Sequence, residues 1–93
     1  MDRHLLLARL KMKGLFERFK AAFSEIEQED ADLFNRLFIA VAMAEKFKPE
    51  QIADTLGIKL KRFEKHLDEI TPAELLTALR FLDEPNFKAK IKD

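Results

Sequence analysis

The chain has 93 residues, of which 47% are apolar and 37% charged, enough for one modest core and a single domain over residues 1–93. It contains no cysteine, which excludes a disulfide framework and a thiolate metal site. Its formal net charge is zero, which argues against indiscriminate binding to nucleic acid, because phosphates are neutralised by Lys and Arg. The charge is nevertheless uneven: +4 over residues 1–23, −5 over 24–45, +3 over 46–66 and −4 over 67–87.

Apolar residues recur at spacings of three and four, and no stretch alternates as a half-buried strand does, so we expect an all-α bundle of about five to six helices. Residues 1–28 form the N-terminal helical segment, either as one long helix or as two helices broken at Gly14. Its apolar stripe predicts core packing, and part of it is also a candidate dimer interface. The residues assigned to that interface are Leu5, Met12, Leu15 and Phe19.

Residues 30–84 are expected to form the core. Asp30 is a candidate N-cap for a central helix, Pro49 suits the first turn of a short helix that ends at Gly57, and another helix runs from about Leu60 to Ile70. Thr71-Pro72-Ala73-Glu74 is a capping box that opens a further helix. We expect that helix to turn Leu75, Leu76, Leu79 and Leu82 inward and to end at residues 83–86, with residues 85–93 as a fraying tail.

Residues 49–67 have the spacing of two short helices that cross tightly. Ala53 is small where the second helix must approach the first, and Gly57 supplies the left-handed conformation of a sharp turn. The apolar residues expected to lock both helices onto a third are Ile52, Leu56, Ile58, Phe63 and Leu67. Through Ala53, Gly57, Ile58 and Phe63, this fifth of the chain resembles the helix-turn-helix family of bacterial and phage DNA-binding proteins.

The resemblance implies that the second helix of the motif enters the major groove of double-stranded DNA and that the first abuts phosphates. Lys61 or Lys65 would then donate to guanine, Glu64 would accept from cytosine, and Leu60 would contact a thymine methyl group. Arg62 would take a phosphate. The complete set of implied DNA-binding residues is Lys48, Gln51, Lys59, Leu60, Lys61, Arg62, Glu64 and Lys65.

Two residues depart from the family pattern. Lys59 stands where a Ser, Thr or Asp usually caps the second helix, and Leu60 is apolar where DNA or solvent is expected.

On the resemblance as a whole, the sequence predicts a dimeric, sequence-dependent DNA-binding regulator of transcription. The alternative is a protein–protein interaction module, a regulator or inhibitor of another protein, that retains the helix-turn-helix shape.

Other classes of function find no support in the sequence. The hydroxyl residues Ser24, Thr55, Thr71 and Thr77 stand in no nucleophile motif, so we expect no enzyme activity. His4 and His66 are expected at the surface or its boundary and have no carboxylates at metal-ligand spacing, so no metal or other cofactor is predicted. The apolar stretches are shorter than the ~20 residues of a membrane span. We therefore expect a cytoplasmic protein without membrane contact.

Overall fold

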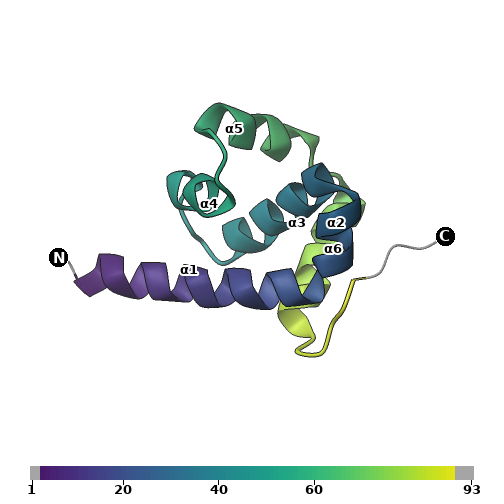
Figure 1. Cartoon of the computed structure of the whole chain (residues 1–93), viewed down its shortest axis with the longest axis horizontal. Helices are drawn as coiled ribbons and strands as arrows, with labels where there is room; N and C mark the ends of the chain where they lie inside the picture. The colour runs from purple at the N-terminus through teal and green to yellow at the C-terminus, as the bar shows by residue number, and fades with distance from the viewer. Residues whose placement is uncertain (1–2, 90–93) are drawn as a thin grey trace.

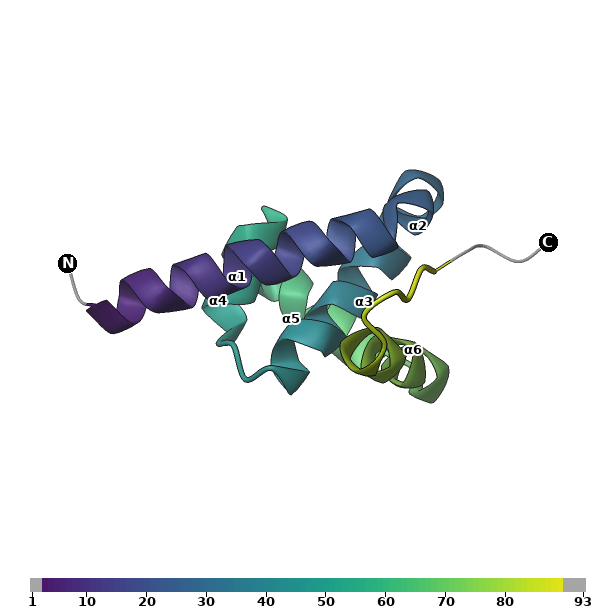
Figure 2. The same cartoon turned by 90° about the horizontal axis from the view of Figure 1, so that it is seen from below.

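The computed structural model describes residues 3–89, which form six α-helices and no strand. This confirms the all-α prediction. The helices are α1 (Arg3–Ala22), α2 (Ser24–Glu29), α3 (Ala31–Ala44), α4 (Pro49–Leu56), α5 (Leu60–Glu69) and α6 (Pro72–Asp83). Figures 1 and 2 show α3 at the centre, with α1 along one side of it and α4, α5 and α6 around the rest.

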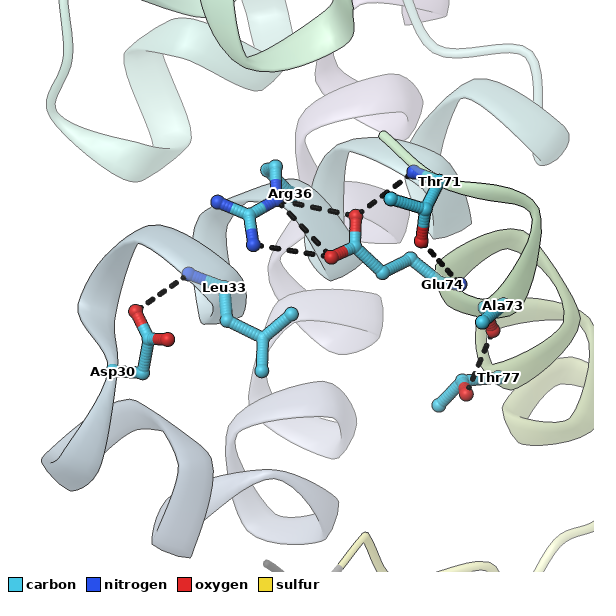
Figure 3. Close-up of polar contacts among 7 residues, drawn as sticks. All are labelled: Asp30, Leu33, Arg36, Thr71, Ala73, Glu74 and Thr77. Carbon is cyan, nitrogen blue, oxygen red and sulfur yellow. Dashed lines mark hydrogen bonds and ion pairs between the residues drawn. The ribbon is translucent and has the colours of Figure 1, made fainter. Parts of the chain in front are cut away.

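The helix boundaries follow the local signals in the sequence. The side chain of Asp30 accepts a hydrogen bond from the Leu33 N–H at 3.1 Å and so caps α3 (Figure 3). The hydroxyl of Thr71 accepts from the Glu74 N–H at 3.2 Å, and the Glu74 carboxylate accepts from the Thr71 N–H at 3.1 Å. Pro49 and Pro72 stand in the first turns of α4 and α6. These starts were all predicted correctly.

The N-terminal segment is one helix through Gly14, and it is interrupted only at Phe23, before α2. Met12, Leu15 and Phe19 are buried in the chain's own core, whereas Leu5 is half exposed. The predicted dimer interface is therefore wrong for these three buried residues. They pack toward the aromatic side chains of α3, so they offer no surface to a second copy.

Phenylalanine rings hold α1, α3 and α6 together. The ring of Phe19 stacks on that of Phe23 at 4.2 Å between centroids, and it meets Phe38 at 5.2 Å and Phe81 at 5.5 Å, both edge to face. Phe87 lies 5.6 Å from Phe23, and the Ala89 N–H donates to the Ala22 carbonyl at 2.9 Å. The expected fraying is therefore wrong for residues 87–89, and residues 90–93 lie outside the described part of the chain.

Helix α6 faces the core with a different side from the one predicted. Ala78 and Phe81 are buried and Leu82 is half-buried, but the other leucines expected to point inward are exposed: Leu75, Leu76 and Leu79. The reason lies in the partners of α6: Phe81 meets the rings of Phe19 on α1 and of Phe23 between α1 and α2, while Glu74 faces Arg36 on α3. Those contacts leave the leucine side turned outward.

A bidentate ion pair joins α3 to α6. The Arg36 guanidinium donates from Nε and Nη2 to the Glu74 carboxylate at 3.1 Å each, and both side chains are largely buried (Figure 3). The hydrogen bond to Glu74 raises the pKa of Arg36 above its ordinary value, although burial acts in the opposite direction. Glu74 thus caps α6 and ties it to α3 with the same carboxylate.

On α5, His66 and Leu67 have the opposite burial from the one predicted. His66 is only 4% exposed, whereas Leu67, expected in the core, is 38% exposed. Phe63 and His66 are three residues apart on one side of the helix, and that side faces the core; Leu67 falls beside it. Neither ring nitrogen of His66 has a hydrogen-bond partner within residues 3–89.

We predict that Arg36→Met lowers the free energy of unfolding by about 2 kcal/mol, because it leaves the Glu74 carboxylate largely buried without its partner. In the double variant Arg36→Met/Glu74→Gln most of this loss should be recovered, since a neutral amide still caps Thr71. Urea unfolding followed by circular dichroism measures both values. Equal stability of the single variant and the parent chain would show that the ion pair contributes nothing.

We further predict that His66→Leu raises the free energy of unfolding by about 1 kcal/mol, because it removes two buried polar atoms that lack partners. His66→Ala serves as the control and should destabilise the fold, since it leaves a cavity. Both are measured by thermal and urea unfolding. A His66→Leu variant less stable than the parent would mean that the imidazole stabilises the core.

Candidate nucleic-acid interface

Helices α4 and α5 are joined by only three residues, Gly57, Ile58 and Lys59. Gly57 has φ +69°, in the left-handed region, as its position in the sequence predicted. Its N–H donates to the Asp54 carbonyl at 3.1 Å, and the Ile58 N–H donates to the Ala53 carbonyl at 3.0 Å. The turn sends α5 across α4, which Figure 1 shows nearly end-on while α5 runs across the view.

The inner sides of both helices are fixed by burial. Ile52 and Ala53 of α4 and Phe63 of α5 are in the core, and both helices pack against α3. Apart from Phe63 and His66, the side chains of α5 are exposed. The exposed ones include all the residues predicted to contact DNA from this helix and its N-cap: Lys59, Leu60, Lys61, Arg62, Glu64 and Lys65. The core therefore determines which side of α5 is presented to a partner.

Most of these residues surround one open depression between α5 and the start of α3. Its lining from the α4–α5 turn and α5 includes five of the predicted residues: Lys59, Lys61, Arg62, Glu64 and Lys65. Leu60 is exposed nearby but does not line it. Lys48 and Gln51 lie elsewhere, at a depression beside α1, where the Gln51 side chain accepts from the Lys48 N–H at 3.1 Å. The structure thus divides the predicted site into two places.

Three polar residues of the depression escaped the sequence analysis: Asp32 and Asn35 on α3, and Asp68 on α5. Asp32 accepts a hydrogen bond from Arg62 Nη2 at 3.3 Å. The role predicted for Arg62, a phosphate contact, therefore competes with an ion pair inside the chain. Both side chains are more than half exposed, so the pair is weak and exchangeable. Asp32 and Arg62 are 30 positions apart in the sequence, so local sequence patterns could not predict this ion pair.

The basic residues are concentrated at one end of α5. Lys59, Lys61 and Arg62 occupy its N-cap and first turn, which contains no acidic residue, while Asp68 and Glu69 lie in its last turn. The N-terminus of a helix is the positive end of its dipole, so cations there cost stability and carboxylates would be favourable. Lys59 also makes no side-chain cap. This charge order opposes the stability of the helix itself.

Metal binding, membrane spans and similarity to known proteins give no further indication of function for residues 3–89. Within residues 3–89 the His, Asp and Glu side chains form no group of three that could hold a metal ion. None of the helices there combines the length and the apolar character that crossing a membrane requires. No family model, curated protein or solved structure matches the chain.

We predict that Lys59→Ser raises the free energy of unfolding by about 1 kcal/mol, because residue 59 already has the extended backbone of an N-cap, with φ −73° and ψ 151°, and serine would accept from the first turn. Lys61→Ser is the matched control: it removes the same charge inside the helix, where no cap can form. Urea unfolding compares the two. An equal effect of both substitutions would contradict the capping argument.

Proposed function

We propose that this protein is a DNA-binding regulator of transcription that inserts the N-terminal half of α5 into the major groove. The observation that supports this most is the set of exposed basic residues at that end of the helix, Lys59, Lys61 and Arg62, where positive charge costs helix stability. Residues that oppose the local stability of a helix without a compensating contact in the fold are typical of a functional site. DNA phosphates would supply the missing negative charge.

The resemblance to the helix-turn-helix family agrees with this orientation of α5. In that family the residues near the start of the second helix reach base edges. Lys61 and Lys65 are four residues apart on the outward side of α5, so both can donate to guanines along one groove. Glu64 lies between them and would accept from cytosine. Arg62 would exchange Asp32 for a phosphate.

The surrounding charges determine what kind of binding to expect. Asp32 and Asp68 line the same depression as the lysines and repel phosphates, and the whole chain has no net charge. Non-specific binding, which depends on phosphate neutralisation, should consequently be weak. Selective binding then depends on base contacts. One α5 reads few base pairs, which is why the proposal includes a dimer on paired half-sites.

A second candidate function is a protein–protein interaction module. Leu60 and Leu67 are 41% and 38% exposed, and because they are seven residues apart they lie on the same side of α5. Charges of both signs surround them. An apolar pair ringed by mixed charge suits a protein surface better than a phosphate backbone. A regulator or inhibitor of another protein would use this side of the helix.

The test is selection of duplexes from a random-sequence library with the full chain at low salt. We expect an enriched motif, and we expect Lys61→Ala/Lys65→Ala to weaken binding to it by at least about tenfold. The matched control, Lys11→Ala/Lys88→Ala, removes the same charge from exposed positions outside α5 and should change the affinity little.

Two outcomes would overturn the DNA proposal. One is the absence of any enriched sequence. The other is an equal loss of affinity in the control variant, which would indicate a general charge effect. Capture of one stoichiometric protein partner, insensitive to nuclease and abolished by Leu60→Ala/Leu67→Ala, would instead establish the interaction module.

A further inference from the structure

Helix α1 has a second apolar side, turned away from the core. The residues that pack inward are centred on Met12, Leu15 and Phe19. On the opposite side, at spacings of four and three residues, lie the residues we call the outer stripe: Arg3, Leu7, Leu10, Gly14 and Glu17. Leu7 and Leu10 are 54% and 57% exposed, and Leu6 beside them is 46% exposed.

The N-terminal half of α1 is therefore apolar on both sides, and a helix with that pattern is normally covered on both. Figures 1 and 2 show the first turns of α1 extending past α3, α4 and α6. Further along, Leu5, Leu7 and Ala8 line depressions shared with α4 and the α3–α4 connection, whereas Leu6 and Leu10 line neither of these depressions. Contiguous exposed leucines of this kind mark an interaction surface in a folded protein. The outer stripe needs a partner.

The charges on the outer stripe indicate what that partner is. Arg3 lies seven residues before Leu10, and Glu17 lies seven residues after it. Neither side chain forms an ion pair with another residue of the described range 3–89. We propose that two copies of this protein associate through α1, antiparallel and centred on Leu10, so that Arg3 of each copy faces Glu17 of the other.

The antiparallel direction follows from the order of the charges. A parallel pair would place Arg3 against Arg3 and Glu17 against Glu17, and like charges in contact cost free energy. The antiparallel pair has a two-fold axis at Leu10, so the same stripe is used by both copies, as in most homodimers. The apolar centre of the stripe is then buried between two oppositely charged ends.

Gly14 provides a second, independent indication. Glycine inside a helix costs about 1 kcal/mol relative to alanine, yet a Cβ built at Gly14 meets nothing within 4 Å in this chain. The fold of the single chain therefore does not require a glycine there. In the antiparallel pair Gly14 lies opposite Leu6 and Leu7 of the partner, and the absence of a side chain makes room for them.

The proposed pairing does not rest on DNA binding. No pair of Cα atoms from α1 and α5 lies within 8 Å, and Figure 1 shows the two helices on opposite sides of the molecule. The two-fold axis would place the two α5 helices at opposite ends of the dimer. Association through α1 thus does not by itself align two α5 helices on one face of a duplex. Failure of the DNA selection leaves the α1 pairing intact, and failure of the pairing leaves the base contacts proposed for each α5 intact.

Disulfide trapping tests the register, because the natural chain has no cysteine. Leu10→Cys should form a disulfide-linked dimer under mild oxidation, since residue 10 meets its own copy at the axis. Arg3→Cys should remain monomeric in the antiparallel pair and would crosslink in a parallel one. Leu76→Cys, at a leucine on α6 that is 64% exposed, is the control and should not crosslink.

Charge reversal tests the ends of the stripe. Two helices bury less than the ~1,200 Å² of a standard interface, so we expect a dimer that dissociates on dilution from millimolar to micromolar concentration in sedimentation experiments. Arg3→Glu and Glu17→Arg should each raise the dissociation constant about tenfold, and the double variant should restore it. The proposal is overturned by a chain that stays monomeric, including one that binds anionic vesicles as a monomer, or by a double variant no tighter than the singles.

Discussion

Helix α3 has to be covered on every side, and this constraint organises the whole chain. Leu37, Phe38, Ile39, Ala40, Val41 and Ala42 are all buried, so no side of the helix in this stretch can face water. The other helices each pack against it. Burial of apolar surface is the largest favourable term in folding, and a helix without a polar side in its middle obtains that term only from surrounding neighbours. The arrangement of the remaining helices follows from this need.

The same constraint decides which side of each outer helix is exposed. Phe63 and His66 turn toward the core, which leaves Lys61, Glu64 and Lys65 outward on α5. On α1 the phenylalanine cluster takes one side of the helix and leaves the outer stripe uncovered. The two surfaces proposed for binding are thus what remains after α3 has been enclosed.

Both surfaces also cost local stability. Cations at the N-terminus of α5 oppose the helix dipole, and Gly14 in the middle of α1 lowers helix propensity. Neither feature is compensated within the chain, except where Arg62 meets Asp32 in an exposed ion pair. A partner molecule would explain residues that the fold of a single copy does not require. The two features lie on separate helices, α5 and α1, which do not touch.

The sequence by itself determined where α3, α4 and α6 begin and where α4 ends, because caps and turns depend on residues a few positions apart, but it did not predict the interruption at Phe23. Asp30, the capping box at Thr71 and Gly57 all act where they were predicted to act. It also determined that basic side chains gather at the start of α5, and five of the predicted residues do surround one depression.

Only the tertiary structure decided which side of each helix is buried. Spacings of three and four describe an apolar side, but a helix with leucines on two sides satisfies them twice, and the aromatic contacts of Phe81 selected the side of α6. The exchange of His66 and Leu67 has the same cause. The pairs Arg36–Glu74 and Asp32–Arg62 join residues 38 and 30 positions apart, so they exist only once the helices have packed.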